Sequence, residues 1–135
     1  MEETVQFTDL SAASSLDTAK EIVRVLHKKL ARDIKLIYAA DMTVLTEYYV
    51  VCHGRSSTHV RALAADLEDE LCKCARPLRR VEGVAGGEWV LVDFGDVIVH
   101  VFSKDAREFY RFERLFKDEA FLPVDEIIPA SEEEA

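Results

Sequence analysis

The feature that most constrains the fold is residues 89–102, where apolar and polar side chains alternate around a Gly95-Asp96 pair. Period-two alternation is typical of β-strands, and a short turn between two such runs predicts a β-hairpin. We expect its strands over residues 88–94 and 97–102. One face of this hairpin carries mostly valines, so it should lie under helices.

Helical and extended patterns alternate along the rest of the chain. In chain order they predict a helix over residues 14–30, strands over 34–38 and 48–52, a helix from 56 or 57 to about 74, a strand over 78–82, the hairpin, and a helix over about 106–116. Ser15 or Asp17 is expected to cap the first helix, and Ser103 or Asp105 the last. The predicted fold class is α/β (α+β), with a mixed sheet of about five strands packed with helices.

Residues 48–52 form a continuous apolar run, which is typical of a strand covered on both faces. A helix and a further strand follow this run. A strand, a helix and a strand in succession favour a parallel, right-handed crossover.

The length of 135 residues predicts one domain. The chain has 17 basic and 26 acidic residues, a net charge of −9, yet residues 10–117 carry only 16 of the acidic groups and all 17 basic ones. We therefore expect an acidic N-terminal tail over residues 1–13, a folded domain over 14–117, and an acidic, partly disordered C-terminal tail over 118–135. The net charge is accordingly weak evidence for a basic partner.

The N-terminus shows no signal-peptide or transit-peptide pattern, and no stretch is apolar enough to span a membrane. A cytoplasmic protein without membrane contact is therefore expected. Cys52, Cys72 and Cys74 are expected to be reduced thiols, because a C-x-C pair on a helix points in two directions. The four histidines show no metal-ligand spacing, so no metal and no cofactor is predicted.

The second face of the hairpin mixes large apolar side chains with polar ones. Its members are Trp89, Leu91, Asp93, Asp96, Ile98, His100 and Phe102. Aromatic residues interleaved with a few polar groups are typical of a protein–protein contact surface. An equally strong alternative is that the last helix covers this face, that Trp89 is core, and that Asp93 pairs with His100. Tyr110 and Glu113, at i and i+3 on that helix, would then flank the face.

The sequence contains no complete catalytic set. The run from Gly54 to Ser57 follows a buried strand and opens a helix, where backbone N–H groups can bind a phosphate. A simple helix cap is the favoured interpretation of this run. The alternative function is a nucleotidyltransferase-like enzyme in which Gly54 and Ser56 bind phosphate and Asp93 and Asp96 bind magnesium. Since no Asp-x-Asp pair stands on a strand, we predict that the chain is not an enzyme.

Several blocks of sequence together resemble a known family. They are Tyr48–Cys52, Gly54-x-Ser56-Ser57-x-His59-Val60, Val81-Glu82-Gly83, Trp89–Phe102 and Arg107-x-x-Tyr110-x-x-Glu113-x-x-Phe116. Over residues 16–117 the chain resembles the ribosomal silencing factor, or Iojap-like, family, with His53 where a Thr or Ser is usual.

The resemblance implies a fold similar to nucleotidyltransferases but without their activity. It also implies binding to ribosomal protein fourteen of the large subunit, a steric block of subunit association, and repression of translation when nutrients are limiting. Little direct contact with ribosomal RNA and a homodimer in the free state are further expectations. The binding residues that it implies are Trp89, Leu91, Asp93, His100 and Phe102, with Glu82 and Tyr110 nearby.

Overall fold

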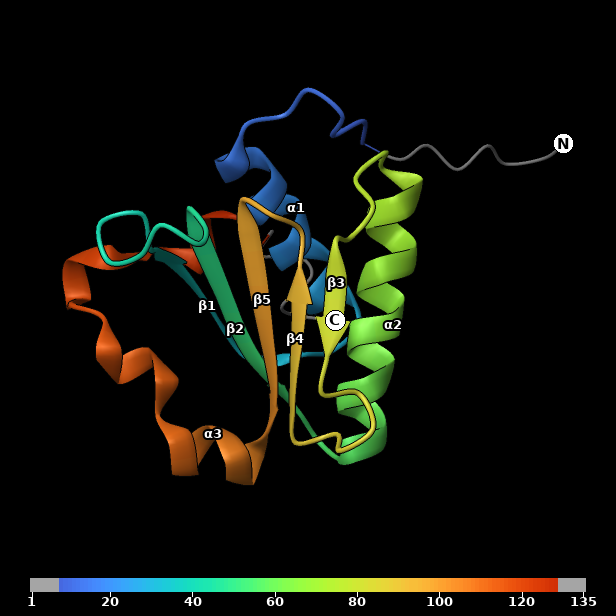
Figure 1. The fold of residues 1–135 in the computed structure, drawn as a ribbon, viewed down its shortest axis with the longest axis vertical. Coiled ribbons are helices and arrows are strands. Elements are labelled where there is room, and N and C mark those ends of the chain that lie inside the picture. Colours follow the sequence, from blue (N-terminus) through green and yellow to red (C-terminus); the bar gives the residue numbers. More distant parts are fainter. Residues whose placement is uncertain (1–7, 129–135) are drawn as a thin grey trace, which may run out of the picture.

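A computed structural model of the chain describes residues 8–128, in which a mixed sheet of six strands separates two helical layers (Figure 1). The strands are β1 (Arg32–Tyr38), β2 (Tyr48–Gly54), β3 (Arg80–Glu82), β4 (Trp89–Asp93), β5 (Val97–Ser103) and β6 (Phe121–Leu122). They lie in the order β3-β4-β5-β2-β1-β6. The predicted α+β class is confirmed, and the sheet has one strand more than the expected five.

β2 and β5 form the parallel centre of the sheet, paired from Tyr48↔Val97 to Gly54↔Ser103. The other neighbouring strands are antiparallel. β2 is buried almost throughout, which confirms the strand predicted to be covered on both faces. β3, which follows β2 through a helix, runs parallel to it, but the hairpin of β4 and β5 stands between them.

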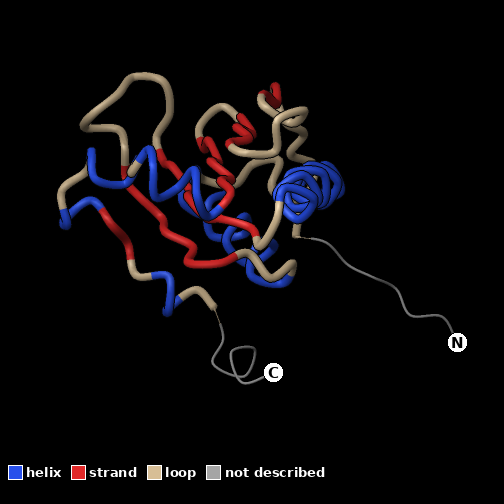
Figure 2. The backbone as a smooth tube through the Cα atoms, turned by 90° about the horizontal axis from the view of Figure 1, so that it is seen from below, coloured by secondary structure: helices blue, strands red, loops and turns tan. Residues whose placement is uncertain are grey.

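Two layers cover the sheet. Helices α1 (Ser15–Lys28) and α2 (Ser57–Lys73) lie on one face, over Val90, Val92 and the alternate valines of β5. The second face is covered by α3 (Lys104–Tyr110) and a 3-10 turn, η1 (Phe112–Leu115), which Figure 1 shows to the left of the strands, on the side away from α2. The turned view in Figure 2 shows helical segments on both sides of the strands.

The hairpin forms in the predicted register. Trp89 lies opposite Phe102, Leu91 opposite His100, and the Phe94 N–H donates to the Val97 carbonyl at 2.9 Å. Gly95 is at φ 97°, as the first central residue of a two-residue hairpin turn requires. The predicted separation into two faces is confirmed along both strands, but the turn residue Asp96 does not belong to the Trp89 face. Its side chain turns to the α1 layer, where it accepts from Ser15 Oγ at 2.9 Å.

The ends of the first helix differ from the prediction. Ser14 is its N-cap, accepting from the Asp17 N–H at 3.1 Å, and the helix ends at Lys28. Leu30 fits the apolar period, but it lies beyond the C-cap at φ 69° and is 61% exposed. The caps of the other two helices, Ser56 and Ser103, are among those predicted.

The predicted last helix, residues 106–116, is shorter than expected. It begins earlier, at Lys104, and ends at Tyr110, because Arg111 adopts a left-handed conformation with φ 51°. The chain then reverses into η1. Tyr110 and Glu113 therefore do not lie on one helix, as their spacing had suggested.

Both expected tails contain structured residues. Leu10 is buried and its N–H donates to the Cys74 carbonyl at 2.8 Å. After residue 117, β6 pairs with β1, and Ile127 and Ile128 are buried in the core beneath α1 and α2. The prediction was wrong over residues 118–128 because these few apolar side chains outweigh the acidic composition of the segment. The acidic residues at 132–134 lie outside the described part of the chain.

The described helices include none that is long and apolar enough to cross a membrane. Cys52 and Cys74 are buried and Cys72 is exposed, so the thiols of the C-x-C pair do point apart, as predicted. Burial raises the pKa of the Cys52 thiol to about 12.

Ile127 and Leu30 provide a test of the structured C-terminal segment. Ile127→Ala should lower the free energy of unfolding by about 2–4 kcal/mol, because it opens a cavity in the core. Leu30→Ala is the matched control and should change it by less than about 0.5 kcal/mol, because its side chain is exposed. Urea denaturation of the two variants measures both values. Equal stabilities would contradict the packing of residues 127–128.

Candidate protein-docking site

Trp89 stands at the centre of a group of rings on the second face of the sheet. Its ring centroid is 4.9 Å from that of Phe102 and 4.8 Å from that of Tyr110. Phe102 comes from the neighbouring strand and Tyr110 from the end of α3. Trp89 is only half-buried, so one side of this ring group faces solvent.

The loop before β4 fixes where Trp89 enters the sheet. Gly83 is at φ 86°, and a Cβ there would lie 2.1 Å from the Trp89 carbonyl oxygen, so only glycine fits. Arg61 of α2 donates to the carbonyls of Val84 and Ala85 at 2.9 and 3.0 Å. The conformation of Gly83 and the hydrogen bonds from Arg61 fix the backbone of this loop. The position of Trp89 at the start of β4 is therefore well defined.

The seven predicted binding residues differ in how far their side chains are exposed to solvent. Phe102 is fully buried, and His100 and Asp93 are 4% and 7% exposed, so these three lie beneath the surface. Trp89 and Leu91 are half-buried, and Glu82 and Tyr110 are exposed. We use the name aromatic face for the four accessible residues Glu82, Trp89, Leu91 and Tyr110. A partner can touch these four without any rearrangement.

His100 supports Trp89 from below. The Trp89 Nε1–H donates to His100 Nδ1 at 3.0 Å, which leaves the proton of the neutral imidazole on Nε2. Burial lowers the pKa of His100 to about 4, so the ring is neutral at pH 7. Its Nε2 is buried without a hydrogen-bond partner among the residues described.

Asp93 does not pair with His100, although the core alternative suggested that it would. Asp93 accepts from the Gly95 N–H at 2.7 Å, which stabilises the hairpin turn, and from Arg80 Nε at 3.2 Å. Its carboxylate therefore has a structural role beside the aromatic face. The same alternative predicted that the last helix covers the Trp89 face. This is partly correct, because α3 and η1 cover much of that face.

The two aspartates of the magnesium hypothesis do not converge. Asp93 binds Arg80 on the aromatic side, whereas Asp96 binds Arg76 and Ser15 on the α1 side. Within residues 8–128 no group of three or more His, Cys, Asp or Glu side chains is placed to hold a metal ion. Ser56 caps α2 by accepting from the His59 N–H at 3.1 Å, which confirms the cap interpretation of the Gly54–Ser57 run.

An ion pair between the buried Arg107 and the partly exposed Glu113 anchors η1 to α3. Arg107 is 7% exposed and donates to both oxygens of Glu113, at 2.8 and 3.0 Å. Its third nitrogen donates to His53 Nδ1 at 2.9 Å. Burial, and next the Arg107 charge, lower the pKa of His53, so its ring stays neutral and accepts this bond. His53 thus acquires a role that the sequence left open.

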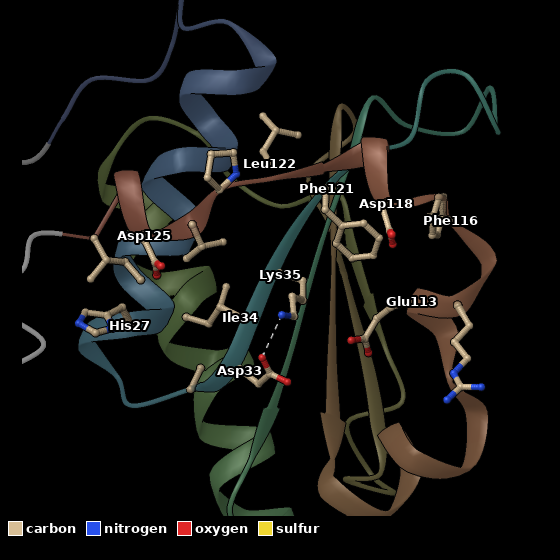
Figure 3. Close-up of a pocket in the computed structure, with 15 residues that line it drawn as sticks. His27, Asp33, Ile34, Lys35, Glu113, Phe116, Asp118, Phe121, Leu122 and Asp125 are labelled. Carbon is tan, nitrogen blue, oxygen red and sulfur yellow. Dashed lines mark ion pairs between the residues drawn. The ribbon is translucent and has the colours of Figure 1, made fainter.

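An open hollow of about 1060 Å³ lies at the far side of η1, against the edge formed by β1 and β6 (Figure 3). Figure 3 shows Phe116 and Phe121 beside it and an ion pair between Lys35 and Asp33, 3.4 Å apart. The lining alternates acidic, basic and apolar groups without the convergent polar set that a small-molecule site needs. The aromatic face is therefore the better candidate.

The sequence reasoning assigned no role to three residues of this region. Phe112 packs on His100 with ring centroids 4.3 Å apart, Arg107 anchors η1, and Phe109 is 78% exposed beside Tyr110. The aromatic residues at 112 and 116 are four apart, and this spacing could have indicated a common face. The Arg107–Glu113 pair could not be found, because both residues were assigned to one continuous helix.

Comparison with known proteins identifies relatives of this chain and of its fold. A family model described as "Ribosomal silencing factor during starvation" matches residues 12–135. The chain belongs to the ribosomal silencing factor family. The resemblance noted in the sequence is thereby confirmed, and the match includes the C-terminal segment that we had expected to be a tail.

Individual relatives agree with this assignment. The ribosomal silencing factor of Bacillus subtilis is 36% identical over 97 residues, which cover 72% of this chain and 82% of the relative. A mouse protein named for mitochondrial assembly of the ribosomal large subunit is 31% identical over 103 residues, covering 74% of this chain and 45% of its own. A solved structure from Chromobacterium violaceum has a TM-score of 0.73 at 32% identity, covering 76% of this chain and 85% of its own.

The buried His100 makes stability depend on pH. Its pKa falls from 6.5 in the unfolded chain to about 4 in the fold, so the unfolded state binds more protons between these values. The contribution of the neutral His100 ring to the free energy of unfolding is fully present above pH 6.5. It is lost as the pH falls toward 4, which lowers that free energy by about 3 kcal/mol.

Urea denaturation at pH 7 and pH 4.5 measures this loss, and His100→Phe serves as the control because it cannot titrate there. The carboxylates titrate in both proteins, so the wild type should lose more stability than the variant. The same loss in both would show that His100 is not buried as a neutral ring.

Proposed function

We propose that the chain binds ribosomal protein fourteen of the large ribosomal subunit through the aromatic face, and that it thereby blocks association of the two subunits. Membership of the ribosomal silencing factor family supports the ribosomal target. The observation that carries the location is the solvent-facing Trp89, supported from below by Phe102 and His100 and from the side by Tyr110.

The aromatic face has the composition of an energetic hot spot. Trp and Tyr dominate such sites because they bury large areas on rings that are already held in place. Trp89 is held by a hydrogen bond and by two rings within 5 Å, so little side-chain entropy remains to be lost on docking. Burial of apolar area contributes roughly 25 cal/mol per Å² before the costs of association.

The charges around the face favour a basic partner. Glu82, Glu88 and Asp93 stand near Trp89, and Arg80 pairs with Glu82 at 2.7 Å and with Asp93 at 3.2 Å. Carboxylates at the border of the face attract Lys and Arg side chains of a partner and repel phosphates. This balance supports docking on a basic ribosomal protein with little direct contact to ribosomal RNA.

The proposed mechanism is occlusion without chemistry. The factor needs only to occupy the surface of the large subunit that the small subunit would meet, and translation is repressed when nutrients are limiting. In the free state the aromatic face is also the natural surface for a homodimer, because an apolar patch without its partner tends to be covered. We expect the protein to act in the cytoplasm, where ribosomal subunits are free.

Trp89→Ala tests the docking surface. Loss of the central ring should weaken binding to purified large subunits by at least about 2 kcal/mol, or roughly thirtyfold. Met42→Ala is the matched control, because Met42 is 60% exposed on the loop at the opposite end of the sheet and should bind normally. Co-sedimentation with large subunits measures both. Normal binding by a folded Trp89→Ala variant would exclude this face.

A subunit-joining assay tests the consequence. Purified small and large subunits are mixed with the wild-type protein and separated on a sucrose gradient. Joined ribosomes should decrease while both free subunits are retained, and Trp89→Ala should leave joining unchanged. An unchanged gradient with wild-type protein that is bound to large subunits would refute occlusion.

A further inference from the structure

Two neighbouring strands end side by side at one edge of the sheet, and their connections leave in opposite directions. β2 and β5 are parallel and are paired up to Gly54↔Ser103. β2 continues into α2 on one face of the sheet, whereas β5 continues into α3 on the other (Figure 1). This divergence opens the kind of crevice in which α/β sheets bind ligands. A hollow of about 510 Å³ at this edge is lined from β1, β2, α3 and η1.

Ionisable side chains form the wall of this hollow. All eight of the described residues that line it are ionisable, namely three carboxylates, one histidine and four cations. The hollow in Figure 3 has the opposite balance, with two cations and four carboxylates. Small-molecule sites have predominantly apolar walls, so this wall does not suit the base of a nucleotide. We use the name cationic hollow for the space lined by His53 and the cations Lys104, Arg107, Arg111 and Arg114.

Most carboxylates of the cationic hollow are already paired. Glu113 accepts from Arg107 at 2.8 and 3.0 Å. Asp33 pairs with Lys35 at 3.4 Å. Within residues 8–128, Glu108 is the only lining carboxylate outside an ion pair, whereas three exposed lining cations form none, namely Lys104, Arg111 and Arg114. Cations without a counter-ion thus outnumber the free carboxylate three to one, which favours an anionic occupant.

The electrostatic environment of His53, which lines the cationic hollow, is positive. Burial is the largest cause of its lowered pKa, and the charge of Arg107 is the next. The charges of Lys104 and Arg32 lower this pKa further, and Asp33 opposes them. Three cations against one carboxylate therefore act on this position, which agrees with the balance of charge along the wall.

α3 connects the cationic hollow to the aromatic face. Lys104, Arg107 and Glu108 lie on one side of α3, where they line the hollow. Tyr110 ends the same helix with its ring centroid 4.8 Å from that of Trp89. A helix rises by about 1.5 Å per residue, so Lys104 and Tyr110 are separated by only about 9 Å along its axis. A molecule that docks on the aromatic face therefore brings its own surroundings close to the hollow.

We propose that the cationic hollow binds one or two backbone phosphates of ribosomal RNA at the place where the RNA borders the protein docked on the aromatic face. This inference rests on the proposed function, because docking is what brings RNA to the hollow. A phosphodiester backbone needs cations and no pocket for a base, and the wall of the hollow provides this combination. The carboxylates at the border of the aromatic face repel phosphates, so the RNA contact stays confined to the hollow.

Removal of two unpaired cations tests this contact. The double variant Lys104→Gln/Arg114→Gln should keep its fold, because both side chains are exposed. It should bind purified large subunits roughly three- to tenfold more weakly, because each cation contributes no more than an exposed ion pair does. The slope of log affinity against log salt should become shallower by about 1 to 2, since fewer counterions are released. Co-sedimentation at several potassium chloride concentrations and constant magnesium measures both quantities.

Two comparisons show where the effect arises. Isolated ribosomal protein fourteen carries no RNA, so the double variant should bind it as tightly as the wild type does. Lys20→Gln/Arg24→Gln is the matched control, because it removes the same charge from α1 on the opposite face of the sheet. This control should leave the salt slope for large subunits unchanged.

The outcomes that contradict the RNA contact can be told apart. Unchanged affinity and slope for large subunits would exclude the contact. An equal loss in the α1 control would mean that only the net charge matters. Weaker binding to isolated ribosomal protein fourteen would mean that the cations contact an acidic protein segment instead. Failure of the wild type to bind large subunits would overturn the proposed function, whereas normal binding with an unchanged slope would overturn only the RNA contact.

Discussion

The structure depends on the burial of β5 on both of its faces. Every residue from Val97 to Phe102 is buried, because β5 lies between β4 and β2 and carries a layer on each side. One set of its side chains packs under α1 and α2, and the other set, with His100 and Phe102, packs under α3 and η1. Since a shift of one residue would exchange the two sets, the register of this strand fixes the site together with the core.

The polar groups of the second face each have a separate structural partner. Asp93 secures the hairpin turn, His100 secures Trp89, and Arg107 secures η1. A surface assembled in this way presents its aromatic side chains in fixed positions. That arrangement suits a protein that acts by occupying a surface, because affinity then comes from rings that need little ordering.

Sequence patterns were sufficient where one local rule decided the structure. The hairpin, its two faces and the capping serines Ser56 and Ser103 follow from alternation, glycine and short polar side chains, and these were predicted. The break after Tyr110 was not predictable, because no sequence pattern marks the left-handed conformation of Arg111 or the Arg107–Glu113 ion pair that spans it. Composition also misled at residues 118–128, where a few apolar side chains dock against β1 and the helices. Which residues of the Trp89 face reach solvent likewise depended on η1, whose position only the tertiary structure defines.

The different environments of the cysteines have a practical consequence. Cys52 and Cys74 are buried, and the high pKa of Cys52 keeps it a protonated, unreactive thiol. Cys72 is exposed on α2, on the side of the sheet away from Trp89. Among the described residues it is thus the accessible point for a maleimide dye, and no substitution is needed to create it. A fluorophore there would report binding of a partner without touching the aromatic face, which is the proposed docking surface.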